Sequence, residues 1–315
     1  MTKRHKPTYM RHPATGWVFP RDGFDWEDFE VACRYPLSPK DIVLMTYPKS
    51  GTTWVQHMLY LLVRDMVPVP EGRRLDSFVP YLEKGGLDLL RGLDLCPQPI
   101  KTHLSFTVMP WSEKPLYVLV LRNPKDVCVS LYHHVRGFSR YYHFDDGCFD
   151  DFFEEFMEGN VDSGDYFDHL HSLWSRREES NVLVLTYEEL RADPLAGVRR
   201  LVDHVRRSFP SDWREPDLRE LVAASSFEAM KAQSPDKWSS TRPEGAPAFI
   251  RKGQVGDWRN YLTPEQTERL ERKFHQRLAG TGAEQLWPTE IALPEGLEPA
   301  YGPPDRAKVK VAGIF

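Results

Sequence analysis

Three short apolar runs along the middle of the chain each lead into a loop and then into a helical pattern. The first covers residues 42–45, and after the loop TYPKSGTT apolar side chains recur at helical spacing, at Trp54, Val55, Met58, Leu59 and Leu62. The second covers residues 116–121, and after RNPKD apolar side chains step by four, at Val127, Leu131 and Val135. The third, residues 182–185, opens another helical stretch. The pattern predicts strand–loop–helix units in series.

The composition of these runs indicates how the strands are arranged. Leu and β-branched residues follow one another without polar alternation, which is typical of parallel strands buried on both faces. We therefore expect an α/β fold, a single domain with a central, mostly parallel sheet flanked by helices and with a phosphate-binding strand–loop–helix unit. In such sheets ligands bind at the carboxyl ends of the strands, where these loops fall.

The rest of the chain is organised around this sheet. Residues 1–40 carry five prolines and read as an N-terminal lead-in packed on the domain, which spans residues 41–287. Residues 151–158 and 165–178 are expected to be amphipathic helices that cover the sheet. A late helix is expected over residues 264–278, with Pro264 in its first turn. Residues 288–315 are rich in proline and read as an extended C-terminal tail.

Charge and composition exclude several classes of protein. The 315 residues include 41 Lys and Arg against 46 Asp and Glu, a net charge of −5, so nucleic acid is not an expected partner. No two of the four cysteines form a C-x-x-C pair, and no metal site is expected. No apolar run approaches the roughly 20 residues of a membrane span, and none follows the charged start MTKRHKPTY. We therefore expect a cytoplasmic protein, without membrane contact, whose cysteines are reduced thiols.

The loop between the first strand and its helix has the composition of a phosphate site. A glycine there allows close approach of the backbone, and the N–H groups and dipole of the following helix favour an anion. Hydroxyls and one ammonium group add to this, from Lys49, Ser50, Gly51, Thr52 and Thr53. The loop is not a Walker A motif, because Lys49 precedes its only glycine. The plain alternative is an ordinary strand–helix turn with a capping threonine.

Two further basic segments could bind phosphate. Arg122 follows the second strand, and Ser130 lies two turns along the next helix. A guanidinium pairs bidentately with phosphate oxygens. The sequence FIRKG places Arg251 and Lys252 beside Gly253, as in a loop that closes over a phosphate. The plain alternatives are a helix start in the first case and a solvated charged turn in the second.

His103 is the candidate general base. It ends the short strand-like piece PIKTHL, and Lys101, two residues before it, lies on the same side of an extended segment. A lone histidine is more often structural than catalytic. Its position beside phosphate-binding loops favours the catalytic interpretation.

Together these segments resemble the cytosolic sulfotransferase family over roughly residues 40–280. TYPKSGTTW is similar to the family's 5′-phosphosulfate loop, and RNPKDVCVSLYHH to its 3′-phosphate segment. RKGQVGDWRNYLT is similar to its C-terminal signature, and KTHL to the region of its catalytic histidine. Four segments in the family's order form a specific pattern.

The resemblance implies a donor, a product and a set of roles. The donor would be 3′-phosphoadenosine 5′-phosphosulfate (PAPS), the product adenosine 3′,5′-bisphosphate (PAP), and the acceptor the hydroxyl or amine of a small molecule. Residues 49–53 would hold the 5′-phosphate, and Arg122, Ser130 and residues 251–253 the 3′-phosphate. The adenine would stack between Trp54 and Phe227, with Tyr187 and Ser225 at its edge. His103 would remove the acceptor proton, while Lys49 and Lys101 stabilise developing charge.

The sequence departs from the family's pattern at its dimer signature. Arg259, Thr263, Pro264 and Glu268 occupy the key positions, and Pro264 replaces a valine. Because proline lacks an N–H for pairing across chains, the usual homodimer is left open. The last part of RKGQVGDWRNYLT and the length of the tail also differ from the family.

The acceptor pocket is the least determined part of the site. Aromatic side chains suit a flat phenol or steroid, and the candidates are Phe24, Phe78, Tyr81, Phe106 and His143. Asp145 and Asp146 follow His143, and an acid near the pocket would favour an amine such as a catecholamine. Each aromatic residue could equally belong to the core.

Three rival interpretations remain. One is an ATP-dependent small-molecule kinase or nucleoside triphosphatase on a related fold, which the missing GxxxxGK[ST] disfavours. Another is a nucleotide-binding protein that has lost catalysis, which the presence of His103, Lys49 and Lys101 disfavours. A Golgi carbohydrate sulfotransferase would need a membrane anchor, and the sequence offers no apolar stretch for one.

Overall fold

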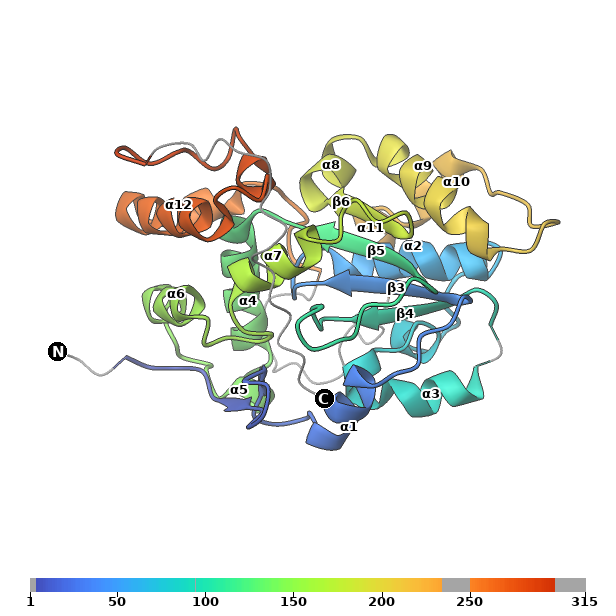
Figure 1. Ribbon diagram of the computed structural model, residues 1–315, viewed down its shortest axis with the longest axis horizontal. Coiled ribbons are helices and arrows are strands. Elements are labelled where there is room, and N and C mark those ends of the chain that lie inside the picture. Colours follow the sequence, from blue (N-terminus) through green and yellow to red (C-terminus); the bar gives the residue numbers. More distant parts are fainter. Residues whose placement is uncertain (1–3, 94, 234–249, 298–315) are drawn as a thin grey trace.

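The computed structural model describes residues 4–93, 95–233 and 250–297 (Figure 1). Its centre is a four-stranded parallel sheet in the order β4-β3-β5-β6. The strands are β3 (Asp41–Thr46), β4 (Gln98–Thr102), β5 (Leu116–Leu121) and β6 (Val182–Thr186). The three apolar runs and the segment before His103 are these four strands. The expected fold class is therefore confirmed.

Alternate side chains of each central strand enter different cores, as the period of two along a strand requires. From β3, Ile42 and Leu44 join the core beneath α2 (Thr52–Val63), while Val43 and Met45 join the core on the other face. Both faces of the two central strands, β3 and β5, are buried, which explains why their apolar runs show no polar alternation.

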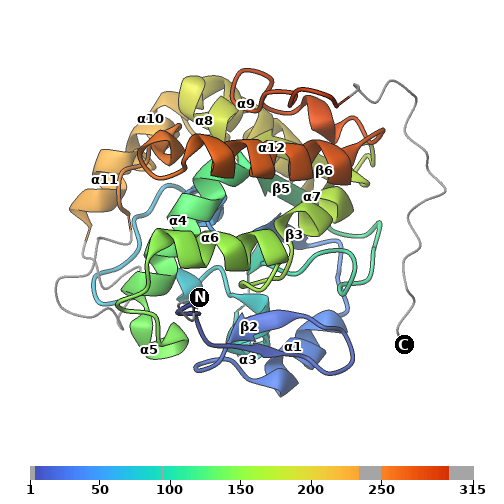
Figure 2. The ribbon, with the colours of Figure 1, turned by 90° about the vertical axis from the view of Figure 1, so that its left-hand side faces the viewer.

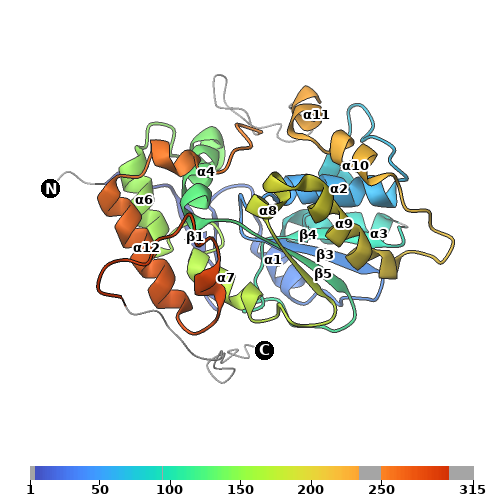
Figure 3. The same ribbon diagram turned by 90° about the horizontal axis from the view of Figure 1, so that it is seen from above.

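Helices cover the sheet on both faces. The α2 side is completed by α8 (Tyr187–Ala192), α9 (Pro194–Val205), α10 (Leu218–Ala224) and α11 (Phe227–Ala232). Figure 1 shows α8, α9 and α10 above the sheet and α1 (Trp26–Cys33) and α3 (Leu87–Gly92) below it. Beyond the carboxyl ends of the strands lie α4 (Pro124–Gly137), α5 (Ser139–Tyr142), α6 (Phe149–Glu158), α7 (Tyr166–Trp174) and α12 (Pro264–Leu278). Figure 3 shows α4, α6 and α12 grouped on that side.

Short turns complete the described chain. There are 3₁₀ turns at Leu75–Ser77, Arg206–Ser208, Asp257–Asn260 and Ala283–Gln285, and an irregular turn at Leu82–Gly86. The helices expected from the sequence form with small shifts at their ends. Asp165 caps α7 rather than belonging to it, and α7 ends at Trp174 because the segment SRREE after it has no apolar residue to bury. Two helices follow β6, because Pro194 begins α9 and cannot continue α8.

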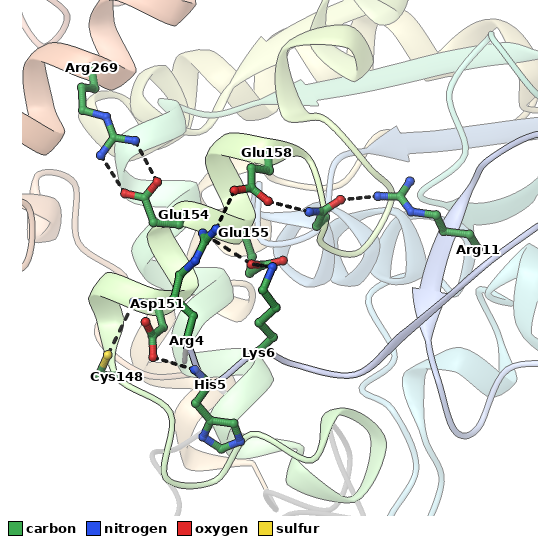
Figure 4. A network of polar contacts seen from close by, with 11 residues as sticks. Arg4, His5, Lys6, Arg11, Cys148, Asp151, Glu154, Glu155, Glu158 and Arg269 are labelled. Atoms are coloured by element: carbon green, nitrogen blue, oxygen red, sulfur yellow. Dashed lines mark hydrogen bonds and ion pairs between the residues drawn. The ribbon is translucent and has the colours of Figure 1, made fainter. Parts of the chain in front are cut away.

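The N-terminal residues add structure of their own to the domain. A hairpin of β1 (Tyr9–Arg11) and β2 (Val18–Pro20) precedes α1, and Figure 2 shows it below α6. Phe19 and Phe29 enter the core that contains Val43 and Met45 of β3. Figure 4 shows residues 4–6 along α6, where Arg4 pairs with Glu158 at 3.1 Å and Lys6 with Glu155 at 2.5 Å.

The C-terminal end of the described chain is also attached to the domain. Trp287 donates from Nε1 to Glu188 at 2.7 Å, and Ile291 is buried. The expected extended tail, residues 288–315, lies outside the described residues from 298 onward. All four cysteines are free thiols. In the part of the chain that the structure describes, no helix is long and apolar enough to cross a membrane.

Candidate functional site

A cavity of about 560 Å³ opens at the carboxyl ends of the strands. The residue that follows each of three strands lines it: His103 after β4, Arg122 after β5 and Tyr187 after β6, together with the loop after β3. The arrowheads of β3 and β5 in Figure 1 point towards α4, and Ser130 and His134 of that helix line the cavity. Parallel strands thus bring together side chains that lie far apart in the sequence. Most predicted donor-site residues line the cavity: Lys49, Gly51, Thr52, Thr53, Trp54, Lys101, His103, Arg122, Ser130, Tyr187, Phe227, Arg251, Lys252 and Gly253.

The loop between β3 and α2 is shaped as an anion cradle. Lys49 and Gly51 have φ angles of 70° and 98°, which turn the chain sharply into the helix. No side chain caps the start of α2, so its first N–H groups stay available to a ligand. A Cβ at residue 51 would lie 2.8 Å from the Tyr187 ring, which explains the glycine. Ser50 is buried behind the loop, and the Thr52 hydroxyl bonds Thr46 Oγ1 at 2.6 Å.

Arg122 joins the loop between β3 and α2 to the loop that contains residues 251–254. It donates from Nη1 to the Lys49 carbonyl at 2.9 Å and from Nη2 to the Gln254 carbonyl at 3.3 Å. Its guanidinium lies 4.3 Å from the centre of the Tyr187 ring. The Nε atom is buried without a partner among the described residues. A buried guanidinium with a donor to spare is suited to an anionic ligand.

The loop of residues 251–253 is held in place by two aspartates. Asp257 accepts from Lys252 and from Arg251, each at 2.6 Å. Burial opposes ionisation of Asp257, but these hydrogen bonds outweigh it and lower its pKa to about 2. Asp126 of α4 accepts from the backbone N–H groups of Gly256 at 2.7 Å and Trp258 at 3.1 Å. Two cations are therefore presented to the cavity on a fixed loop.

Aromatic rings surround the neighbouring part of the cavity. Trp54 and Tyr187 pack edge to face with centroids 5.8 Å apart, and Phe227 lines the same wall. Gly253 lies so close to Phe227 that a Cβ would come within 2.5 Å of the ring. Ser225 does not line the cavity, because its buried hydroxyl donates to the Leu221 carbonyl at 2.7 Å.

The orientation of His103 fixes its tautomer. Its Nδ1 lies 2.9 Å from the Thr46 carbonyl oxygen, which only accepts, so Nδ1 carries the proton and Nε2 keeps its lone pair. Burial, with Lys101 as the next cause, lowers the pKa of His103 to about 3, so the imidazole is neutral. A neutral imidazole with a bare nitrogen is the form a general base requires. Lys49 acts on this pKa in the same direction, and both lysines line the same cavity as His103.

The predicted acceptor residues divide into two groups. Phe24 and Tyr81 line the cavity, with ring centroids 5.9 Å apart, and Tyr81 packs on His103 at 5.2 Å. The other three lie away from it. Phe78 packs on Tyr60, Phe106 packs on Trp111 and Tyr117, and His143 is exposed and pairs with Asp22 at 2.8 Å.

Several residues of the site have no motif of their own. Glu83, which is buried, accepts from the His103 backbone N–H at 2.6 Å and from the Thr102 hydroxyl at 2.8 Å, and burial raises its pKa to about 7. His134 and Asp162 line the cavity from α4 and from the loop before α7. Asp126 lies within RNPKDVCVSLYHH and Asp257 within RKGQVGDWRNYLT, so their membership of these two motifs is what could have identified them from the sequence.

Three of the four positions of the expected dimer signature have side-chain partners within the chain. Thr263 caps α12 in a capping box with Gln266, and Pro264 is its first residue. Arg259 pairs with Glu290 at 3.0 Å and Glu268 with Arg272 at 2.7 Å. Among the described residues, no group of three or more His, Cys, Asp or Glu side chains could hold a metal ion.

Comparison with known proteins agrees with this geometry. The family model of the sulfotransferase domain matches residues 39–282. The chain is 32% identical to mouse sulfotransferase 1B1 over 283 residues, covering 82% of this chain and 89% of that one. It is 34% identical to dog sulfotransferase 1A1 over 270 residues, covering 81% and 89%.

Solved structures share the fold. Mouse sulfotransferase SULT7A1 complexed with PAP gives a TM-score of 0.73 at 22% identity, covering 90% of this chain and all of that one. Retinol dehydratase in complex with androsterone and the inactive cofactor PAP gives 0.72 at 24% identity, covering 86% and 90%.

Proposed function

The chain belongs to the sulfotransferase domain family, and we propose that it transfers a sulfuryl group from PAPS to a small acceptor. The acceptor group is a hydroxyl, or an amine, on a phenol, steroid or other alcohol, or catecholamine. One observation carries the proposal: a basic phosphate loop, a neutral His103 and Arg122 meet in one cavity at the ends of three adjacent strands. PAP in related structures supports the choice of donor.

The residues present fit a nucleotide with two phosphate groups. Gly51 and Gly253 leave room beside aromatic rings where a Cβ would collide, and Arg122 keeps an unused buried donor. The open start of α2, with Lys49, would hold the 5′-phosphate end. Arg122, Ser130 and the cations of residues 251–252 would hold the 3′-phosphate. Trp54 and Phe227 would enclose the adenine, with Tyr187 at its edge.

The transfer is an in-line displacement in which the chain supplies a base and positive charge. His103 Nε2 accepts the acceptor's proton as the acceptor oxygen bonds to sulfur. The bond between sulfur and the 5′-phosphate oxygen breaks, its electron pair stays with that oxygen, and PAP leaves. Lys49 and Lys101 stabilise the charge on the transferred group and the leaving phosphate. The donor's own negative charges would raise the pKa of His103 towards its ordinary value and strengthen it as a base.

The first test separates this function from its rivals by ligand binding. A thermal shift is measured with PAP and, separately, with ATP and Mg²⁺ at matched concentration. Ligand at a hundred times its Kd adds about 2.7 kcal/mol of stability. A shift with PAP alone is expected. A shift with ATP and Mg²⁺ alone would replace the proposal with a kinase, and no shift with either would indicate a chain that has lost nucleotide binding.

Two further parts of the proposal concern the cell and the assembly. We propose a cytoplasmic location, and fractionation of expressing cells tests it. A homodimer stays a prediction, with sedimentation at several concentrations as its test. The internal partners of Arg259, Thr263 and Glu268 leave their side chains engaged within one chain.

A further inference from the structure

Three acidic side chains line the cavity, and they differ in what they contact. Asp76 Oδ1 lies 3.6 Å from Lys101 and accepts from Gln56 at 3.0 Å, and its Oδ2 accepts from Arg74 at 3.4 Å. Both oxygens of Glu83 are occupied by Thr102 and His103. Asp162, only 7% exposed, accepts from the Tyr142 hydroxyl at Oδ2, while Oδ1 is buried without a partner in the described chain. Asp162 is therefore the acid with an oxygen left for a ligand.

Asp162 also lacks a counter-ion among the described residues. Burial raises its pKa to about 7, and the one other influence on it is the Tyr142 hydroxyl. The titratable groups around it are tyrosines from separate elements: Tyr9 of β1, Tyr47 of the phosphate loop, Tyr81 and Tyr142. A buried carboxylate without a cation is costly, and a cationic ligand removes that cost.

Asp162 and His103 line the same cavity, which limits the shape of such a ligand. Tyr81 packs on the His103 ring and lines that cavity with them. Phe24, Tyr141 and Tyr142 continue the aromatic wall. A flat ring lying on this wall can place one substituent at His103 and another at Asp162.

A cation on the same wall sets the direction of the ligand. Lys84 Nζ lies 5.1 Å from the centres of the Phe24 and Tyr141 rings. It would repel a second ammonium group placed there. An amine on the ligand is therefore favoured at Asp162 and disfavoured at the Phe24 side.

We propose that Asp162 Oδ1 binds a protonated amine on the acceptor, so that the acceptor class is a phenol carrying an alkylammonium group. The proposal rests on the sulfotransferase function and names its acceptor class. It moves the acidic determinant from Asp145 and Asp146 to Asp162. Asp146 is 86% exposed and pairs with His5 at 3.0 Å, and neither of those two residues lines the cavity.

The test compares tyramine with 4-propylphenol, which has the same length without the charge, at pH 8 with saturating PAPS. The wild-type kcat/KM is expected to be at least about tenfold higher for tyramine, since a close charged hydrogen bond is worth roughly 1.5–3 kcal/mol. Asp162→Asn keeps the shape and an acceptor for Tyr142. It is expected to remove the preference through a higher KM for tyramine, with 4-propylphenol unchanged. Asp146→Asn is the matched control and should leave both acceptors unchanged.

Several other outcomes would count against the proposal. A wild type that prefers 4-propylphenol, treats the two alike or uses neither while still binding PAP overturns it. Equal losses for both acceptors in Asp162→Asn would assign the residue a structural role. If that variant does not fold, the wild-type preference alone decides. A wild type that gives no thermal shift with PAP would instead refute the sulfotransferase proposal itself.

Discussion

The backbone at Gly51 adopts a conformation that only glycine reaches without strain. Its φ of 98° and ψ of 13° lie outside the regions open to other residues. In Gly51→Ala the new Cβ would also lie 2.8 Å from Tyr187 Cδ2. The Tyr187 ring packs on Trp54 and beneath Arg122, so moving it disturbs the proposed adenine-binding rings and the guanidinium together.

The magnitude follows from these two effects. Backbone strain at such an angle costs on the order of 1–3 kcal/mol, and each kcal/mol lowers Tm by roughly 1.5 °C in a chain of 315 residues. If the substitution destabilises the PAP-bound state by about 1.4 kcal/mol more than the free state, the Kd for PAP rises about tenfold. Isothermal calorimetry measures the Kd, and a thermal melt without ligand measures the stability.

A second glycine provides the matched control. Gly280 has a φ of 74°, a Cβ added there would have nothing within 4 Å, and the residue does not line the cavity. Gly280→Ala should lose stability through strain and bind PAP as the wild type does. A Gly51→Ala protein with wild-type affinity for PAP would refute the role given to the loop.

Three further variants test other parts of the site. His103→Ala should lose turnover while keeping its thermal shift with PAP, and near-normal turnover would exclude the base assignment. Asp126→Ala removes the acceptor of two backbone N–H groups, those of Gly256 and Trp258, and leaving a buried donor unpaired costs about 1–3 kcal/mol. The Kd for PAP should therefore rise about tenfold or more, with the acceptor KM unchanged. An unchanged Kd would show that other contacts fix the loop. Folding raises the pKa of Glu83 from 4.5 to about 7, so between these pH values the folded chain keeps a proton that the unfolded chain has lost. The free energy of unfolding should therefore fall as pH rises through this window, by on the order of 3 kcal/mol from this group. Denaturant melts of Glu83→Gln should show a shallower fall, and curves parallel to the wild type would contradict the assignment.

The sequence is sufficient for most of the fold because the two central strands are buried on both faces. Continuous apolar runs at residues 42–45 and 116–121 are easily recognised, and the helices after them have clear periodicity. The split between α8 and α9 follows from Pro194, but the apolar pattern alone does not show it. The hairpin β1–β2 has strands of three residues each, too short for a periodic signal.

The candidate site is predictable where its residues are local in sequence. Lys49, Arg122 and Arg251 lie in motifs whose loops follow strands or carry glycines. The positions of Glu83 and Asp162 in the site are set by tertiary packing. Nothing near either residue in the sequence shows that it contacts His103 or lines the cavity.

The sequence does not show which aromatic side chains line the acceptor pocket, for a related reason. Composition does not determine where a side chain points, so from the sequence Phe78 and Phe106 are as plausible as Phe24. The structure places these two in packed clusters and Phe24 on the cavity wall.

The central claim is acceptor-dependent sulfuryl transfer in this cavity. Its most direct test is the release of PAP from PAPS, followed by chromatography, with and without a phenolic acceptor, for the wild type and His103→Ala. We expect PAP and a sulfated acceptor in equal amounts from the wild type and neither from the variant. Equal PAP release with and without acceptor, or from both proteins, would contradict it.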